Sequence, residues 1–492
     1  MRTVVGLDVS TTAAKAIVWD ASGAAISEGR GAIDLATPRK GFFEQRADDW
    51  WDAACASLRS IAASGAEAIA IAHQRETFVA VDASGAPLRG AIVWMDERAK
   101  GDVAPFADAI GRDRLHRTTG KPACVTPSLY KIAWMRREEP ALFARARFAD
   151  VHAFVAARLT GRFATSVAAA DPMGLLDLAH GDWADEVLAA LGIDRARVPE
   201  LVPTGALLGQ VTPEAARATG LREGLRVFAG GGDGQVAALG AGLDGPGRAY
   251  LNLGTAVVLG VVTDRYATDL AFRTMAGAAP GTFVCESDLK GGALSLEWFL
   301  SRFAPGATAA ELDAEAERLS PGADGVLFVP YLASVMNPYW DDAATATLVG
   351  LSASHGRAHV WRAILEGIAL EQRLAIEGIE RATGRRIESL VALGGGAKSD
   401  LWCRIVADAT ARPVVRSRTV EATCLGAGIL AAVGAGIHAD VGAAIRAMTA
   451  TGDRFEPRDA AAYDAIFPRF AGLYPALTSR GAAPSAGPGR PR

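Results

Sequence analysis

The residue best placed for chemistry in this sequence is Asp233, an acid that stands between glycines. Gly231 and Gly232 precede it and Gly234 follows it, directly after the apolar stretch 227–229. Because glycines remove side-chain cover, the carboxylate is expected at a strand end with open access. Phosphoryl transfer uses such an acid to accept the proton of a substrate hydroxyl. The alternative, an acid that caps a helix over residues 235–239, is slightly favoured by the local sequence alone.

Three further polar turns also follow apolar strands. In the first, residues 8–12, Thr11 and Thr12 can cradle phosphate oxygens, and Asp8 can hold a metal ion through water. The other two are Gly254-Thr255 and the segment Gly394-Gly395-Gly396-Ala397-Lys398-Ser399-Asp400, which precedes a helix predicted over residues 401–410. Glycines in such turns let a flat ring or a phosphate approach the backbone. Each alone is more often a structural turn, but together they favour a ligand site at the carboxyl ends of strands.

Two charged runs follow short apolar strands. The first is Gln74-Arg75-Glu76, and the second is Asp96-Glu97-Arg98, which lies beside Trp94. They are either solvated loops with ion pairs or a set of donors and acceptors for the hydroxyls of a sugar. Trp94 is either core or an apolar wall against the carbon–hydrogen face of a ligand.

The elements that must position these residues form an α/β pattern that occurs twice. Strands are predicted over residues 4–7, 16–19, 25–29, 68–72, 78–81, 91–94 and 227–229, with a helix over 48–63 and a largely helical region over 131–191. After Gly242 a strand, a tight turn and a second strand follow over residues 249–262, as at the start of the chain. This predicts two related lobes, residues 1–242 and 243–480, and a disordered tail over 481–492.

Length and composition agree with two lobes. The chain has 492 residues, half of them apolar and 22% charged, with a net charge near −4. No basic surface suggests nucleic acid or anionic lipid, and no stretch reads as a targeting or membrane-spanning segment. The five scattered cysteines suggest reduced thiols and a cytoplasmic location.

Many ordered motifs resemble those of the FGGY carbohydrate kinases, the family that includes xylulokinase and glycerol kinase. The resemblance runs from about residue 4 to about residue 437. Its motifs are Gly6-Leu7-Asp8 with Thr11-Thr12, Gly41-Phe42-Phe43-Glu44-Gln45, Gln74-Arg75-Glu76-Thr77, Trp94 with Asp96 and Arg98, Leu159-Thr160-Gly161, Gly231-Gly232-Asp233, Gly254-Thr255, Pro330-Tyr331-Leu332, Leu365-Glu366-Gly367-Ile368 and Gly394-Gly395-Gly396-Ala397-Lys398-Ser399.

The resemblance implies two ribonuclease-H-like lobes of the actin and hexokinase type, with ATP and a sugar meeting in the cleft between them. It implies that Asp233 is the catalytic base and that Asp8 lies near Mg²⁺, with both acids as metal ligands. Phosphate contacts are implied for Thr11, Thr12, Gly254 and Thr255, and adenosine contacts for Gly394, Gly395, Gly396, Ala397 and Asp400. Substrate contacts are implied for Gln74, Arg75, Glu76, Trp94 and Asp233.

The departures from the family pattern concern the substrate. Thr126 stands where glycerol kinase has a substrate-binding tyrosine, and Gly234 stands where both subfamilies place an amide residue. Xylulokinases usually carry Met-His at the position of Arg75-Glu76. Ser334-Val335-Met336 replaces the common Gly-Glu-Arg, and Thr345-Ala346 replaces an Arg-Gly. These changes leave the reaction intact and the sugar open.

The sequence therefore favours an ATP-dependent kinase of a pentulose such as D-xylulose. The alternatives are a polyol kinase acting on glycerol, erythritol or a similar chain, and an ATP-binding scaffold of the same fold without turnover. A dinucleotide-dependent oxidoreductase is disfavoured because no glycine-rich turn has the Gly-x-Gly-x-x-Gly spacing. A small sugar or polyol is the expected partner, nucleic acid and membrane are not, and a homodimer is left open.

Overall fold

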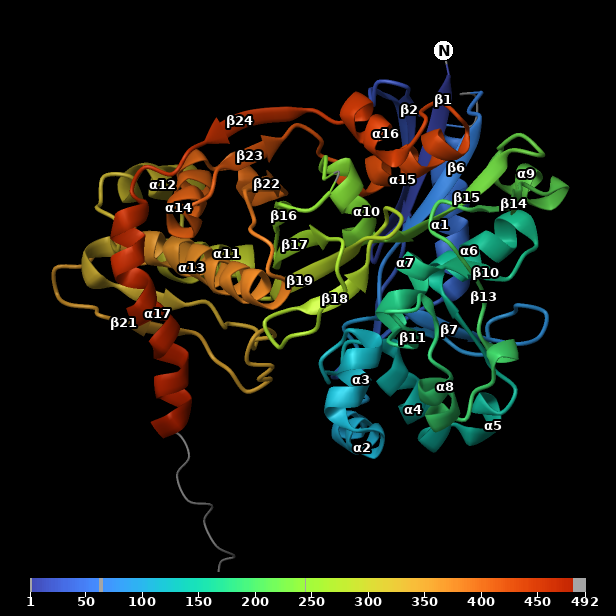
Figure 1. Cartoon of the computed structure of the whole chain (residues 1–492), viewed down its shortest axis with the longest axis horizontal. Helices are drawn as coiled ribbons and strands as arrows, with labels where there is room; N and C mark the ends of the chain where they lie inside the picture. Colours follow the sequence, from blue (N-terminus) through green and yellow to red (C-terminus); the bar gives the residue numbers. More distant parts are fainter. Residues whose placement is uncertain (1, 62–64, 244, 481–492) are drawn as a thin grey trace, which may run out of the picture.

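The computed structural model describes residues 2–61, 65–243 and 245–480, so the predicted tail at 481–492 lies outside the described residues. The chain forms two α/β lobes that lie side by side, with the N-terminal half in one and most of the C-terminal half in the other (Figure 1).

The sheet of the first lobe has six strands in the order β14-β15-β6-β1-β2-β3. These are β14 (Leu207–Gln210), β15 (Arg226–Gly232), β6 (Ala68–His73), β1 (Thr3–Val9), β2 (Ala13–Asp20) and β3 (Ala25–Ala32). Strand β1 pairs antiparallel with β2 and parallel with β6, and β15 pairs parallel with β6. The carboxyl ends of β1, β6 and β15 therefore meet at one edge of the sheet, where Asp8, Gln74 and Asp233 follow.

The sheet of the second lobe repeats this arrangement in the order β18-β19-β17-β16-β22-β23-β24. The strands are β18 (Arg273–Ala276), β19 (Phe283–Leu289), β17 (Val257–Thr263), β16 (Arg248–Leu253), β22 (Ser389–Leu393), β23 (Val414–Ser417) and β24 (Thr451–Phe455). Strand β16 pairs antiparallel with β17 and parallel with β22, as β1 does with β2 and β6. The repeat expected after Gly242 is thus a repeat of topology.

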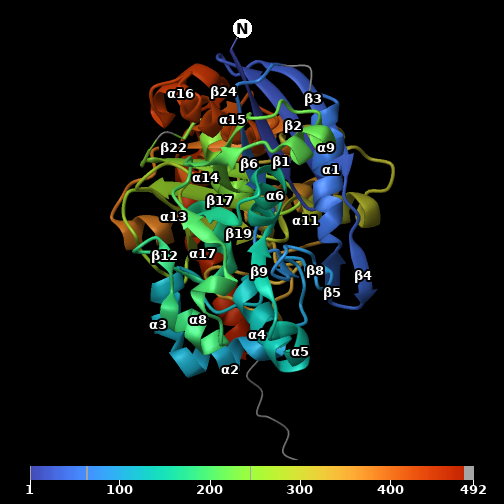
Figure 2. The same cartoon turned by 90° about the vertical axis from the view of Figure 1, so that its right-hand side faces the viewer.

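Helices cover the sheets where the strands are apolar and buried, as in β1, β6 and β16, whereas the outer strands β3 and β24 are largely exposed. In the first lobe α1 (Ala47–Arg59) packs on β2 and β3, as Figure 2 shows, and α6 (Val151–Thr160) packs beside it. In the second lobe the long helix α13 (Arg357–Thr383) lies in the core with α11 (Gly292–Phe303), α12 (Ala309–Ala316), α14 (Asp400–Thr410) and α17 (Ala460–Arg480).

A smaller mixed layer extends the first lobe. Its five-stranded sheet has the order β4-β5-β8-β7-β9, with bounds Ala36–Arg39, Phe42–Gln45, Ala91–Ile92, Phe78–Val81 and Arg147–Asp150. The accompanying helices are α2 (Lys100–Ile110), α3 (Arg112–Thr119), α4 (Ser128–Glu138), α5 (Pro140–Phe143) and α8 (Asp185–Leu191). Helix α7 (Val167–Ala170) packs against β15, and α9 (Pro213–Thr219) packs against α1 and α6. The region predicted as largely helical, 131–191, also contains the short strands β9, β10 (Ala164–Ser166), β11 (Leu176–Asp177) and β12 (Asp182–Trp183).

One segment of the C-terminal half packs on the first lobe, which a division of the chain at residues 242/243 does not anticipate. Helices α15 (Ala422–Gly434) and α16 (Val441–Met448) lie over the first sheet beside α10 (Asp233–Gly240), and the chain then returns through β24 to the second sheet (Figure 1). The apolar residues of α15 share a core with Val4, Ile17 and Ala70 of the first sheet. The domain boundary itself stays a prediction.

No helix in the described ranges combines the length and the apolar composition that crossing a bilayer requires.

Candidate active site

Asp233 lies at the carboxyl end of β15 and is the first residue of α10. Its side chain does not cap the helix in the usual way: Gly232 is the N-cap, and Asp233 Oδ1 accepts a hydrogen bond from its own neighbour, the Gly234 amide, at 2.7 Å. The side chain is 39% exposed. An ionised acid at a helix N-terminus is stabilised by the helix dipole, and this one remains open to a ligand.

Arg75 covers the other side of the Asp233 carboxylate. Its Nε lies 2.9 Å from Asp233 Oδ1, and its own side chain is only 11% exposed. Both donors to Asp233 therefore bind the same oxygen, Oδ1.

Asp8 faces the same space from the end of β1. Its Oδ1 is buried and has no hydrogen-bond partner among the described residues. Burial, and after it the negative charges of Asp233 and Glu421, raise the pKa of Asp8 to about 8. The buried, unpartnered Oδ1 of Asp8 fits one ligand of a cation that prefers oxygen. Within the described ranges, no group of three or more His, Cys, Asp or Glu side chains could hold a metal ion.

A cavity of about 270 Å³ lies between the lobes at this point. The first lobe contributes Asp8, Arg75, Asp233, Gly234 and Ala237; the second half of the chain contributes Tyr250, Asn252, Val258, Leu393, Gly394, Val420, Glu421, Ala422 and Thr423. The structure thus brings together four of the predicted site residues, namely Asp8, Arg75, Asp233 and Gly394. They come from both halves of the chain.

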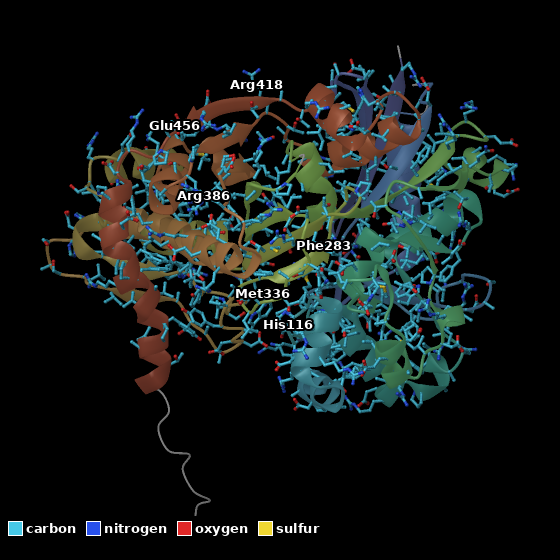
Figure 3. The ribbon with its side chains drawn as sticks, in the orientation of Figure 1. His116, Phe283, Met336, Arg386, Arg418 and Glu456 are labelled. Carbon is cyan, nitrogen blue, oxygen red and sulfur yellow. The ribbon has the colours of Figure 1, made fainter. Side chains whose placement is uncertain are left out.

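A second, larger cavity of about 690 Å³ begins at Trp94. Residues of both lobes line it, among them Thr126 and Glu97 from the first, and Lys290 and Ser334 from the second. The side chain of Trp94 is 37% exposed, and its Nε1 donates a hydrogen bond to Thr11 Oγ1 at 3.1 Å. Trp94 is therefore a cavity wall rather than core. The labelled His116 and Met336 mark the facing sides of the lobe junction near this region (Figure 3).

The first polar turn is held in place by amide side chains. Gln45 donates to the Thr11 carbonyl at 2.6 Å, and Gln74 donates to Gln45 Oε1 at 2.8 Å. Thr11 itself donates to Gln74 Oε1, while Thr12 is exposed at the turn. Gln74 is 1% exposed, so the structure places it beneath the turn and not on the cavity surface. Its contact with a substrate stays a prediction.

Glu76 is buried and pairs with Arg273 at 2.9 Å, and its contact with a substrate stays a prediction.

Six further predicted residues lie on neighbouring turns outside the lining of the first cavity. Gly254 and Thr255 connect β16 to β17, and Thr255 is exposed. Gly395, Gly396 and Ala397 form a 3₁₀ turn, Gly395–Lys398, which follows Gly394. Asp400 begins α14 and pairs with Arg416 at 2.5 Å.

Gly394 has to be glycine for two reasons. Its φ is +85°, and a Cβ at this position would lie 2.4 Å from Asn252 Oδ1. The turn that begins at Gly394 therefore passes close to the end of β16. The two predicted nucleotide turns of the second lobe, residues 254–255 and 394–400, thus adjoin each other.

Several residues of the site were not predicted from the sequence. Tyr250 and Asn252 line the first cavity, and Glu286 and Arg273 are charged residues inside the strands β19 and β18. A charged side chain within an apolar strand needs an ion-pair or hydrogen-bond partner when it is buried. Charged residues within these two apolar segments were therefore a signal that the sequence contained. Asp96, considered as a sugar ligand, instead pairs with Arg98 at 2.8 Å and is fully buried.

Two lobes of the same α/β topology, with acids and glycine-rich turns of both facing one cavity, define a phosphotransferase of the actin and hexokinase type. The comparisons agree with this class. The N-terminal domain model of the FGGY family of carbohydrate kinases matches residues 3–240, and its C-terminal domain model matches residues 249–435. The chain belongs to the FGGY family of carbohydrate kinases.

Similar proteins come from several branches of this family. The xylulose kinase of Bacillus subtilis (strain 168) is 29% identical over 442 residues, which cover 88% of each chain. The glycerol kinase of Bordetella parapertussis is 31% identical over 457 residues, covering 87% of this chain and 88% of the relative. The crystal structure of xylulose kinase from Rhodospirillum rubrum superposes with a TM-score of 0.92 at 30% identity, covering 97% and 99% of the two chains.

These findings confirm the predicted family and two-lobed fold. The chain is a carbohydrate kinase, and its phosphate donor is ATP, as in the other sugar kinases of the family.

Proposed function

We propose that this kinase transfers the γ-phosphate of ATP to a hydroxyl of a pentulose, with D-xylulose as the first candidate. The observation that carries the proposal is the Asp233 carboxylate, which faces the interlobe cavity with one oxygen held by Arg75 and the Gly234 amide. Its other oxygen is positioned to accept the hydroxyl proton. The new bond then forms between the substrate oxygen and phosphorus while the bond from phosphorus to the ADP oxygen breaks.

The turns around the cavity supply the nucleotide contacts in this proposal. Thr11 and Thr12 of the first lobe, with Gly254 and Thr255 of the second, bind the phosphates through hydroxyl and amide groups. Gly394, Gly395, Gly396, Ala397 and Asp400 hold the adenosine.

Asp8 and Asp233 would hold Mg²⁺, which supplies positive charge for the transferring phosphoryl group when bound. The unpartnered buried oxygen of Asp8 supports this assignment. Because two carboxylates alone are a weak cage, the remaining ligands would be water and phosphate oxygens, as Mg²⁺ prefers.

The size of the second cavity supports a substrate longer than glycerol. Thr126 replaces the tyrosine expected for a glycerol kinase and lines a space of about 690 Å³ beside Trp94. A three-carbon substrate would be loosely positioned there, and loose positioning lowers the rate of the chemical step. The relatives named xylulose kinase support the same choice.

The test is ADP release by the purified enzyme with a panel of pentuloses, polyols and aldoses. A pentulose is expected to give the highest kcat/KM and glycerol a low one. Enlarging the side chain by Thr126→Tyr should shift the preference toward shorter polyols. A preference for glycerol over every pentulose and longer polyol would establish the second candidate, a polyol kinase, which the Arg75-Glu76 pair and the similarity to a glycerol kinase favour.

A homodimer and a cytoplasmic location stay predictions from the sequence. Analytical ultracentrifugation of the purified chain over a tenfold range of concentration distinguishes a dimer from a monomer.

A further inference from the structure

Five charged side chains alternate in sign across the junction between the lobes, in the order Glu76, Arg273, Glu286, Arg75 and Asp233. Arg273 lies 2.9 Å from Glu76 and 2.5 Å from Glu286. Arg75 lies 2.8 Å from Glu286 and 2.9 Å from Asp233. We call this set the ion chain. Arg273 and Glu286 belong to β18 and β19 of the second lobe, and the other three belong to the first.

Glu286 is the centre of the ion chain and is fully occupied by protein groups. Its Oε1 accepts from Arg273, and its Oε2 accepts from Arg75 and from the Tyr250 hydroxyl at 3.0 Å. The side chain has no exposed surface. Burial alone would raise its pKa, but the charges of Arg75 and Arg273 lower the pKa of Glu286 to about 2. It therefore stays ionised and has no free oxygen for a substrate.

Gly232 and Gly234, the glycines on either side of Asp233, leave space for the Arg75 side chain. The sequence had suggested instead that they leave the Asp233 carboxylate uncovered. A Cβ at Gly232 would lie 2.5 Å from Arg75 Cγ. A Cβ at Gly234 would lie 3.1 Å from Arg75 Cζ and 3.1 Å from Glu286 Oε2. A side chain at Gly234, where the family pattern has an amide residue, would thus be in tight contact with the Arg75–Glu286 pair.

We propose that Glu286 is a positioning residue for the catalytic base: it fixes the Arg75 guanidinium, and Arg75 in turn fixes the orientation of the Asp233 carboxylate. Arg273 holds Glu286 from its other side. Because Glu286 and Arg273 lie on the second lobe, the base is correctly oriented only while the lobes keep this arrangement. The inference rests on the proposed role of Asp233 as the base.

The test compares Glu286→Gln with a matched control, Glu366→Gln. Glu366 is a buried glutamate of the same lobe that pairs with Arg362 at 2.7 Å and accepts from Tyr463 at 2.9 Å, away from the cavity. Both variants remove one buried charge and keep the side-chain size. For Glu286→Gln we expect kcat per folded molecule to fall about 10- to 100-fold with KM for ATP within threefold, the cost typical of a misplaced catalytic group. For Glu366→Gln we expect kcat within twofold of wild type.

A double-mutant cycle tests whether Glu286 acts through Arg75. In an Arg75→Met background, Glu286→Gln should lower kcat by no more than about twofold further, because the link is already lost. Arg273→Lys keeps the positive charge beside Glu286 and should therefore retain more activity than Arg273→Met. If Glu286→Gln fails to fold, the comparison of these two Arg273 variants provides the same test.

The inference is overturned if Glu286→Gln keeps kcat within threefold of wild type, or if its loss persists undiminished in the Arg75→Met background. These outcomes are distinct from failure of the proposed function, which is tested on Asp233 itself. If Asp233→Asn retained substantial turnover, the base would be misassigned whatever Glu286 does.

Discussion

At the scale of single residues, the main feature of the site is that the two groups holding the Asp233 carboxylate both bind one of its oxygens. Arg75 and the Gly234 amide hold one carboxylate oxygen and leave the other exposed to the interlobe cavity. The proposed role of Asp233 as a base needs both a fixed orientation and a free oxygen, and two donors on Oδ1 are compatible with both needs.

Replacing Asp233 by Asn should abolish sugar phosphorylation while ATP still binds. Asn preserves the size and much of the hydrogen bonding, but it cannot take up the hydroxyl proton, and a positioned base typically contributes ~10²–10⁴-fold to the rate. Steady-state kinetics with ADP detection measures the loss, and isothermal titration with ATP checks that binding survives. Activity within about tenfold of wild type would exclude Asp233 as the base.

At the scale of elements, α15 reaches the first sheet because glycines allow close approach. A Cβ at Gly426 would lie 2.0 Å from the Val236 carbonyl oxygen of α10. In turn, a Cβ at Gly240 of α10 would lie 1.9 Å from the Ala422 carbonyl oxygen. The two helices therefore cross backbone to backbone, and one of them, α10, begins with Asp233.

Gly426→Ala should destabilise the protein, because the added methyl group meets a carbonyl that belongs to a packed helix. Overpacking of this kind costs about 1–3 kcal/mol. Urea denaturation followed by circular dichroism measures the change, and Gly472→Ala on α17 is the control, since no atom outside its own helix neighbourhood lies within 4 Å of a Cβ there. Equal stability of the two variants would contradict the close crossing.

Helix α13 contains a buried acid that makes stability depend on pH. Glu371 is 4% exposed, and its oxygens accept from the Tyr331 hydroxyl at 3.0 Å. Burial raises its pKa to about 8, with the Tyr331 hydrogen bond opposing the shift. The folded chain therefore holds this proton to a higher pH than the unfolded chain, whose glutamate ionises near 4.3.

From this difference we expect the contribution of Glu371 to stability to decline as pH rises from about 5 to about 8, by up to ~1.4 kcal/mol per pH unit. The Glu371→Gln variant, which cannot ionise, should lack this decline. Its stability relative to wild type should therefore be higher at pH 8 than at pH 5.5, as measured by urea denaturation of both proteins at both values. A constant difference between the two proteins would show that Glu371 ionises normally in the fold.

At the scale of the whole molecule, the lobes are joined by buried polar contacts along one strand. Lys121 and Asp171 of the first lobe pair at 2.6 Å, and both also bind the backbone of β18: Lys121 donates to the Thr274 carbonyl at 2.6 Å, and Asp171 accepts from the Ala276 amide at 3.0 Å. Together with the ion chain, these contacts fix the second lobe near β18 and β19. Arg75 and Asp233 of the ion chain line the first cavity, and no member of the ion chain is among the lining residues of the second.

ATP and sugar together are expected to draw the lobes together about these contacts. Closure would exclude water from the transferring phosphoryl group and suppress wasteful hydrolysis of ATP. Small-angle X-ray scattering should show a smaller radius of gyration with both ligands than with either alone. An unchanged radius under saturating ligands would contradict closure.

Much of the local structure was predictable because its determinants are local. Apolar runs predicted β1, β6, β15, β16 and β17, and glycine or threonine turns follow β1, β15 and β16. The helices α1, α10 and α14 began within one or two residues of their predicted starts. The same turns placed Asp8 and Asp233 at strand ends of the first sheet, where β1 and β15 both pair parallel with β6 and so end at a common edge. Gly394 follows β22 of the second sheet.

The sequence by itself thus determined two repeated lobes and the chemical character of the turns between them, since each depends on residues close together in the chain. Only the tertiary structure decided which side chains meet. Arg75 and Glu286 are 211 positions apart, and no periodicity links them. Gln74 turned inward and Arg75 filled the space beside Gly232 and Gly234 because buried charges and amides take the nearest partners that packing provides. The placement of α15 on the first sheet likewise depends on a close backbone approach between distant parts of the chain, that of Gly6 in β1 to the Cys424 carbonyl of α15, which a Gly/Ala-rich sequence does not specify.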